Sequence, residues 1–215
     1  MLSPLFPEGG LRRGSTVGIA TATGGMSLAL LIAAGVSRDG WVAALGLPSL
    51  GSLAAAEMGA RLERMALVPR PGDQWPVVAA PLLDGVDLLL IGPDLRAKGS
   101  QARLLSARAR ERGVVMVLLD SHWPESPDIR LEVSGCVWEG LGHGHGRLVA
   151  RRVEVASMGR RAAAMERRLS IWLPSPEGDV RACDPAGPVL QGAHGFDGGS
   201  CAHVAKSLGA TPVAG

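Results

Sequence analysis

Short apolar runs recur along the first half of the chain, and a helix-forming stretch follows most of them. The two clearest runs, residues 86–92 and 114–120, are hydrophobic at nearly every position, so both faces of each predicted strand are buried. Strands of this kind that alternate with helices indicate a parallel sheet covered on both sides. The pattern therefore predicts an α/β fold with a mostly parallel central sheet flanked by helices. The other predicted strands are residues 16–21, 40–47 and 63–71.

Several segments between the apolar runs predict helices. Residues 27–36 are apolar nearly all round and consist of good helix formers, so this helix is expected in the interior. Residues 100–113 are amphipathic, with arginines on the side that faces water. The remaining predicted helices are residues 49–59 and 75–85.

The pattern changes after Asp128, where apolar and polar residues begin to alternate. Residues 129–140 and 146–157 both show this alternation, and the glycine-rich stretch between them is typical of a hairpin turn. The parallel core is therefore expected to end in an antiparallel hairpin. His143 and His145 in the turn would share one face of an extended chain, but no cysteine or carboxylate lies close in sequence to complete a metal site. We interpret the stretch as a flexible turn and predict no metal.

The composition shifts again after the second hairpin strand. Residues 159–173 are rich in arginine, whereas residues 174–215 are rich in Gly, Pro, Ser and Ala without periodicity. A segment with so little apolar patterning cannot bury enough surface to fold, so we expect it to be mostly disordered. The predicted organisation is a lead-in (1–16), a folded domain (17–158), an Arg-rich segment (159–173) and a tail (174–215).

The composition supports one well-cored domain in a chain of 215 residues. Hydrophobic residues make up 47% and charged residues 20%, a globular balance. Aromatic residues reach only 3% and tyrosine is absent, so the core is expected to be aliphatic. The net charge of +2 is too small to indicate nucleic-acid binding by itself.

Other features indicate the cellular compartment. The chain has three widely spaced cysteines and no CxxC pair, which suits a reducing cytoplasm. Its first residues lack the charged region, apolar run and cleavage site of a signal peptide. The longest apolar stretch, residues 26–36, is too short to span a bilayer. We therefore expect a cytoplasmic protein that has no membrane partner.

The stretch "VGIATATGGMSLALLIAAG", residues 17–35, has the strand, glycine turn and helix of a phosphate-binding loop. A working loop has the pattern GxxxxGK[ST], in which the lysine neutralises the phosphates and the hydroxyl holds Mg²⁺. Gly24 stands at the second glycine of this pattern, but Gly25 replaces the lysine and Met26 replaces the Ser/Thr. Ser27 lies one position late for the metal. We interpret the loop as a vestige that binds no cofactor.

From residue 5 to about residue 158 the chain resembles the core of the RecA recombinase family in the order of its features. "FPEGGLRRGSTVGI" resembles the family's lead-in to the nucleotide loop, and residues 129–157 resemble its closing hairpin. The resemblance implies a RecA-like core in which the metal-binding aspartate falls at Gly92 and the water-activating glutamate at Leu47. Phosphoryl transfer needs the lysine, the aspartate and the glutamate. We therefore expect a degenerate NTPase fold that is not an enzyme.

The runs "PLFPEGGLRRGS", "LVPRPG" and "WEGLGHGHGRL" carry a narrower resemblance, to catalytically degenerate RecA-like proteins of the actinobacterial ImuA-prime type. It implies an accessory role in the SOS DNA damage response, in a mutasome that performs error-prone translesion synthesis. The implied partners are an ImuB-type Y-family adaptor and, through it, an error-prone C-family DNA polymerase, with recruitment to the nucleoid. Two alternatives stay open: an ATP-dependent DNA-binding RecA-family ATPase with an unusual loop, and a SulA-like inhibitor of cell division.

Candidate partner-binding groups are arginines in and after the hairpin, together with one tryptophan. Arginine-rich stretches grip phosphates and so favour DNA contact, but they also form solvated faces, and Glu154 and Glu166 lie among these arginines. Trp172, at the edge of the predicted tail, is the candidate for a docking anchor. The arginines are Arg151, Arg152, Arg160, Arg161, Arg167 and Arg168.

Overall fold

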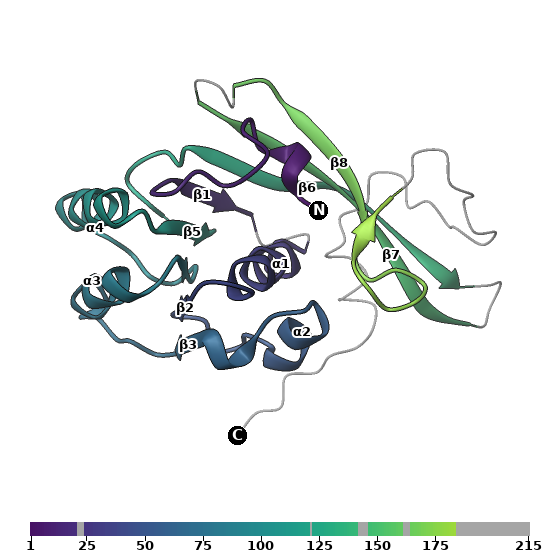
Figure 1. Cartoon of the computed structure of the whole chain (residues 1–215), viewed down its shortest axis with the longest axis horizontal. Helices are drawn as coiled ribbons and strands as arrows, with labels where there is room; N and C mark the ends of the chain where they lie inside the picture. Colours follow the sequence, from purple (N-terminus) through teal and green to yellow (C-terminus); the bar gives the residue numbers. More distant parts are fainter. Residues whose placement is uncertain (21–23, 121, 142–145, 161–163, 184–215) are drawn as a thin grey trace.

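In a computed structural model of the chain, the described residues are 1–20, 24–120, 122–141, 146–160 and 164–183. They form a single sheet with helices on both faces of its parallel part (Figure 1). The strands are β1 (Thr16–Ile19), β2 (Val42–Leu45), β3 (Met65–Val68), β4 (Leu88–Ile91), β5 (Val115–Leu119), β6 (Ile129–Leu141), β7 (Gly146–Gly159), β8 (Arg167–Trp172) and β9 (Arg181–Ala182). The helices are α1 (Gly25–Ser37), α2 (Ser52–Glu57), α3 (Trp75–Gly85) and α4 (Gly99–Arg112), with short 3-10 helices η1 (Ser3–Leu5) and η2 (Leu62–Arg64).

The strand order across the sheet is β3-β2-β4-β5-β1-β6-β7-β8-β9. Neighbouring strands from β3 to β6 run parallel, and those from β6 to β9 run antiparallel. Each parallel strand before β6 lies close to its predicted place. The structure thus confirms the predicted α/β fold, in which a mostly parallel sheet is flanked by helices and ends in an antiparallel hairpin.

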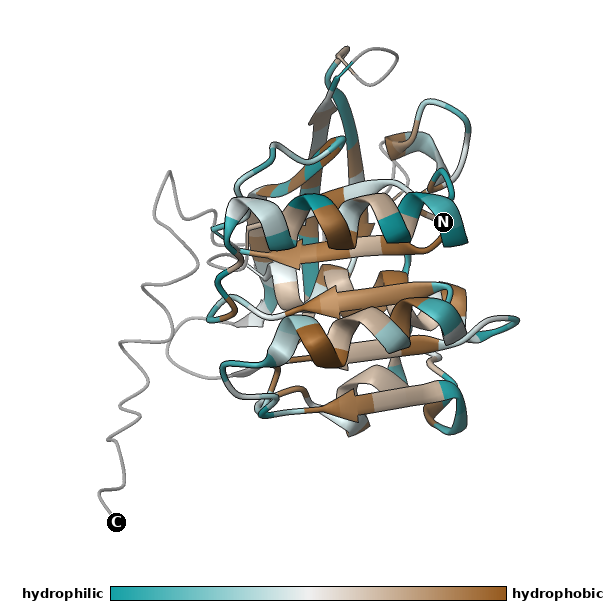
Figure 2. Cartoon of the chain, turned by 90° about the vertical axis from the view of Figure 1, so that its left-hand side faces the viewer, coloured by the Kyte–Doolittle hydropathy of each residue, from teal (hydrophilic) through white to brown (hydrophobic). Residues whose placement is uncertain are grey.

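The parallel strands are buried because each presents apolar side chains to helices on both faces. Leu88 and Leu90 of β4 belong to the core that contains α1, whereas Leu89 and Ile91 belong to the core beneath α3 and α4. All four of these side chains are fully buried. Figure 2 shows the apolar strands behind helices that carry hydrophilic residues on their outward side. Truncation of one such leucine to alanine is expected to cost roughly 2–5 kcal/mol.

The antiparallel extension shares the core of α1. Val153 and Val155 of β7 and Ile171 of β8 are buried in the same cluster as Leu28 of α1, and Leu5 of η1 packs there too. Alternate residues of the extension therefore face the interior, as the sequence pattern predicted. The register of β6 against β7 shifts twice, between Val133 and Gly135 and between Glu139 and Leu141.

The sheet continues beyond the predicted domain boundary at residue 158. The expected Arg-rich segment (159–173) contains β8, which pairs with β7 from Ser157 opposite Arg167 to Arg152 opposite Trp172. The prediction of a separate segment is therefore wrong for these residues. In this stretch Leu169 and Ile171 alternate with polar neighbours, as in a strand, but the many arginines made the alternation hard to recognise from the sequence.

The predicted tail also begins too early. Ser175 is fully buried, its backbone N–H donates to Asp179 at 2.7 Å, and its hydroxyl accepts from the N–H of Glu177 at 3.1 Å. β9 then pairs with β8. Residues 174–183 are thus part of the folded unit, while the rest of the predicted tail, 184–215, lies outside the described residues. The turn at Ser175 depends on polar contacts, which apolar periodicity does not reveal.

Candidate functional site

The vestigial loop lies between β1 and α1, where the sequence placed it. β1 ends at Ile19, and α1 begins at Gly25 after Gly24, whose φ of 105° lies in the left-handed region that favours glycine. The carbonyl oxygen of Gly24 accepts a hydrogen bond from the N–H of Leu28 at 3.3 Å. The strand–loop–helix architecture is therefore present, and the question is which groups occupy the catalytic positions.

Gly25, at the lysine position, has no room for a side chain. A β-carbon built on it would lie 1.9 Å from the carbonyl oxygen of Ala20 and 2.9 Å from a methyl carbon of Ile19. Real β-carbons do not approach a backbone oxygen so closely, so any larger residue requires the backbone to move. The space that a side chain at this position would need is therefore filled by the backbone of Ala20 and the side chain of Ile19.

Gly92, at the aspartate position, is closed in the same way. It follows β4 directly, and its N–H donates to the carbonyl oxygen of Leu45 at 2.8 Å. A β-carbon on Gly92 would lie 2.0 Å from the carbonyl oxygen of Gly46, which follows β2. The ends of two neighbouring strands thus meet backbone to backbone where a metal-binding carboxylate would stand.

Leu47, at the glutamate position, is a core residue. Its side chain is 5% exposed and packs in the apolar cluster that contains α1. A carboxylate at this place would lose its hydration without gaining a partner, which is costly. The lysine, aspartate and glutamate positions therefore all hold groups that the surrounding packing fixes.

Arg151 of β7 brings a cation to the start of α1. Its Nε donates to the carbonyl oxygen of Leu173 at 2.8 Å, and its Nη2 lies 3.3 Å from the hydroxyl of Ser27. The guanidinium carbon lies 5.2 Å from the centre of the Trp138 ring, within the range of a cation–π contact. The structure thus places Arg151 against the vestigial loop instead of on an outer docking surface. No sequence pattern indicates this contact, because Arg151 and Ser27 are 124 positions apart.

The remaining predicted arginines do not gather into one patch. Arg151 and Arg152 are consecutive in a strand and so point to opposite faces of the sheet. Arg160 donates to the carbonyl oxygen of Ser126 beyond the end of β7. Arg167 donates to the carbonyl oxygen of Met165 at 3.3 Å, and Arg161 lies outside the described residues.

Arg168 forms the solvated face that the sequence left as one interpretation. It is paired with Glu154 at 3.4 Å and with Glu166 at 2.9 Å. The charge of Glu166 and the hydrogen bond that Arg168 donates to Glu154 raise the pKa of Arg168 above its ordinary value. A cation that is already neutralised by two exposed carboxylates is a poor phosphate ligand.

Trp172 and Arg152 lie opposite each other in the pairing of β7 with β8. Both are half-buried, and Arg152 makes no side-chain hydrogen bond or ion pair with the rest of the described chain. Because Val153 and Ile171 point into the core, Arg152 and Trp172 lie on the outer face of the extension. This pair is the part of the predicted docking set that remains available to a partner.

Metal and nucleophile chemistry finds little support in the described ranges. They contain no cluster of three histidine, cysteine or acidic side chains able to hold a metal ion, and His143 and His145 lie outside them. Partial burial raises the pKa of the Cys183 thiol, so the thiol stays protonated near neutral pH. None of the helices between residues 1 and 183 that the structure describes has the length and hydrophobicity needed to cross a membrane.

The strand order and the β1–loop–α1 unit define a RecA-like α/β protein. The solved structure described as "Crystal structure of the RadB recombinase" matches with a TM-score of 0.53, over 82% of this chain and 94% of that chain. Its sequence identity of 15% supports a shared fold alone.

Sequence comparisons define the family. The family model of the MT3502 N-terminal domain matches residues 4–125. An uncharacterized protein, Rv3395c, of Mycobacterium tuberculosis (strain ATCC 25618 / H37Rv) is 38% identical over 154 residues, which cover 67% of this chain and 74% of that protein. The chain therefore belongs to the MT3502 N-terminal domain family. The matched region runs from η1 through β5 and ends before β6.

Proposed function

We propose that this protein is a non-catalytic, RecA-like accessory protein that acts by binding other macromolecules. One observation carries the proposal: the lysine and aspartate positions of the nucleotide site are glycines whose β-carbons would lie about 2 Å from backbone oxygens, at 1.9 Å for Gly25 and 2.0 Å for Gly92. A relaxed loop would not restore the site either, because glycine supplies no charged group at either position.

Arg151 does not replace the missing lysine in this proposal. Its guanidinium is held by the carbonyl oxygen of Leu173 and the Trp138 ring, so it stabilises the closed loop. Phosphoryl transfer also needs a metal-binding carboxylate and a base that orients the nucleophile. With Gly92 and Leu47 at those places, a cation alone would not produce turnover.

We assign the accessory role to the DNA damage response. The protein would support error-prone translesion synthesis together with an ImuB-type adaptor and, through it, a C-family DNA polymerase, with DNA as a further ligand. This assignment is supported by the resemblance of the runs around residues 4–15, 67–72 and 138–148 to ImuA-prime proteins. A RecA-like architecture without its catalytic groups is consistent with such a role.

The outer face of β7 and β8 is the proposed docking surface for the adaptor. Trp172 and Arg152 lie opposite each other there, and tryptophan and arginine are the residue types that most often dominate binding energy at interfaces. At the end of the same strand pair, Met158 is 54% exposed and Met165 is 74% exposed, which adds apolar surface. A docking face of this kind requires no nucleotide.

A nucleotide titration tests the non-catalytic part of the proposal. Calorimetric titration of the full chain with Mg²⁺-ATP is expected to give no binding in the micromolar range. The double variant Gly25→Lys/Met26→Thr, once circular dichroism shows that it is folded, is expected to show no ATP turnover, because Leu47 and Gly92 still lack the base and the metal ligand. Micromolar affinity that depends on Mg²⁺, or turnover in the double variant, would contradict the proposal.

A partner screen tests the assigned role. The full chain is expected to capture an ImuB-type adaptor, and the variant Arg152→Ala/Trp172→Ala is expected to lose most of this capture. Arg70→Ala/Leu67→Ala is the matched control, because these residues are exposed at the opposite edge of the sheet. Capture of the division tubulin instead of the adaptor would favour a division inhibitor and would overturn the assignment.

A further inference from the structure

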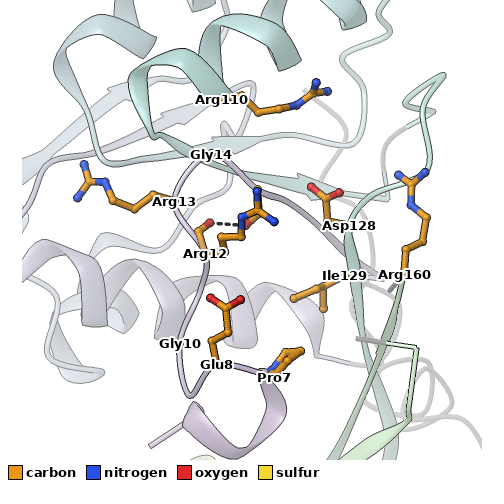
Figure 3. Close-up of a pocket in the computed structure, with 11 residues that line it drawn as sticks. Pro7, Glu8, Gly10, Arg12, Arg13, Gly14, Arg110, Asp128, Ile129 and Arg160 are labelled. Atoms are coloured by element: carbon orange, nitrogen blue, oxygen red, sulfur yellow. Dashed lines mark hydrogen bonds between the residues drawn. The ribbon is translucent and has the colours of Figure 1, made fainter. Parts of the chain in front are cut away.

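An open cavity lies at the end of β1 opposite the vestigial loop. It has a volume of about 600 Å³ and is enclosed by the lead-in before β1, the last turn of α4, the start of β6 and the chain just after β7. Figure 3 shows the charged side chains that line it, with Arg13 pointing away from the others. These are Glu8, Arg12, Arg13, Arg110, Asp128 and Arg160.

The carboxylates of the cavity do not neutralise its arginines. Asp128 is committed to β1, since one of its oxygens accepts from the backbone N–H of Thr16 at 2.9 Å and from the Thr16 hydroxyl at 3.0 Å. Glu8 makes no ion pair within the described chain. Four arginines and two carboxylates therefore line the cavity, and even with Arg13 paired to Asp87 the positive charge is in excess.

Two of the four arginines have no side-chain partner in the part of the chain that the structure describes. Arg13 pairs with Asp87 at 2.9 Å, and Arg160 donates to the carbonyl oxygen of Ser126. The side chains of Arg12 and Arg110 make no hydrogen bond or ion pair with any described residue. Unpaired guanidinium groups in one concave site favour an anionic ligand, because arginine binds phosphate through two parallel N–H donors.

The backbone around Arg12 and Arg110 is fixed. The hydroxyl of Ser15 donates to the carbonyl oxygen of Arg12 at 2.6 Å, as the dashed line in Figure 3 marks. Gly14, with a φ of 76°, lies so close to α4 that a β-carbon on it would be 2.9 Å from the Cα of Arg110. The lead-in is thus seated on the helix that carries Arg110, and both arginines are held at the rim of one cavity.

We propose that this cavity binds the phosphate group of a compact ligand, either a free nucleoside diphosphate or the 5′-terminal phosphate of a DNA strand. A volume of this size is typical of sites for small molecules and cofactors. A terminal phosphate carries up to two negative charges and three acceptor oxygens, which matches several arginines better than a single carboxylate does. The site is separate from the vestigial loop and does not depend on the proposed accessory function.

The test uses the full chain, with pyrophosphate as the first probe in calorimetric and thermal-shift titrations. Wild type is expected to bind pyrophosphate, and Arg12→Ala/Arg110→Ala is expected to bind it at least about tenfold more weakly, because each lost charge-assisted hydrogen bond costs more than a tenfold change in affinity. Arg70→Ala/Arg96→Ala is the charge-matched control, since both residues are exposed beyond the far ends of β3 and β4. The control is expected to bind like wild type, and circular dichroism checks that all variants are folded.

Further arms identify the source of the phosphate. Preference for a 5′-phosphorylated oligonucleotide over its 5′-hydroxyl twin would identify a strand end, whereas tighter binding of a nucleoside diphosphate than of either oligonucleotide would identify a free nucleotide. Arg12→Lys keeps the charge but removes the two-donor geometry, so it is expected to bind pyrophosphate with intermediate affinity. Equal pyrophosphate binding by wild type and Arg12→Ala/Arg110→Ala would overturn the proposal. Binding of an oligoglutamate peptide without any response to pyrophosphate would overturn it as well.

Discussion

The two ends of β1 have opposite characters. After Ile19, where parallel α/β proteins place their ligands, the backbone of Ala20 fills the space next to Gly25. Before Thr16, at the end where such folds have no conserved site, a cavity of about 600 Å³ is lined by arginines. The strand–loop–helix architecture is therefore present while the space beside Gly25 is filled, and the arginine-lined cavity lies at the other end of the strand.

Packing and charge explain this difference. Gly46 and Gly92 let the backbones at the carboxyl ends of β2 and β4 come into contact, so no space for a side chain remains between these two strand ends. In the cavity before β1, the guanidinium groups outnumber the carboxylates and do not pack against one another, because a charged group that loses its hydration without gaining a partner is costly. Close backbone contact thus fills the space between the ends of β2 and β4, and like charge keeps the cavity before β1 open.

The largest effect is expected for Gly92→Asp. Its side chain would meet the carbonyl oxygen of Gly46, where even a β-carbon lies at 2.0 Å, and would bury an unpaired carboxylate. Overpacking together with a buried charge is expected to cost more than about 4 kcal/mol in unfolding free energy, and so to lower Tm by roughly 8–16 °C in a thermal melt. An unchanged Tm would mean that this end of the sheet has room for a metal ligand.

A smaller loss is expected for Gly25→Ala, with Gly35→Ala as its control on the same helix. The new methyl group of Gly25→Ala would lie 1.9 Å from the oxygen of Ala20, whereas a β-carbon on Gly35 has no atom within 4 Å. The first change is expected to cost about 3 kcal/mol by overpacking. The second is expected to stabilise the helix by up to about 1 kcal/mol. Equal melting temperatures for the two variants would show that the loop is not closed.

At the open end, Gly14→Ala is expected to disturb the lead-in, with Gly10→Ala as its control. Gly14 has a φ of 76° and is seated against Arg110, while Gly10 has no neighbour within 4 Å of its added β-carbon. Strain in the left-handed region together with this contact is expected to cost about 2 kcal/mol. Gly10→Ala is expected to leave the unfolding free energy in urea unchanged. A silent Gly14→Ala would mean that the lead-in is not anchored on α4.

The smallest effect is expected for removal of the residues from Pro174 onward, which hydrogen-bond the backbone of Arg151. A chain that stops at Leu173 loses the hydrogen bond from the N–H of Arg151 to the carbonyl oxygen of Pro174, 2.9 Å long, and the pairing of β9. We expect a loss of roughly 1–2 kcal/mol, because each such bond contributes about 1 kcal/mol net. A chain that stops at Cys183 retains both contacts and is expected to have the same melting temperature as the full chain. Equal melting of the two truncated chains would show that residues 174–183 do not support the fold.

The hydrophobic pattern was enough to predict the parallel strands, the helices between them and the hairpin of β6 and β7. It failed for β8, where Arg167 and Arg168 concealed the alternation of Leu169 and Ile171. The interpretation of Gly25, Leu47 and Gly92 as lost catalytic positions also came from the sequence, through its resemblance to the RecA family, and it stays a prediction. Such features are local, since they depend on residue type and spacing along a short stretch of chain.

Only the tertiary structure revealed that the two glycine positions are closed and that Arg151 lies against Ser27. It also brought Arg12, Arg110 and Arg160 together from separate parts of the chain. Each of these features depends on the strand order, which brings distant parts of the chain together. Arg151 and Ser27, for example, are 124 positions apart in the sequence. Hydrophobic burial sets which residues lie inside, but it does not specify which distant polar groups meet, because many arrangements bury the same apolar surface. The sequence therefore determined the fold class, and the packing of distant elements decided where space and charge remain.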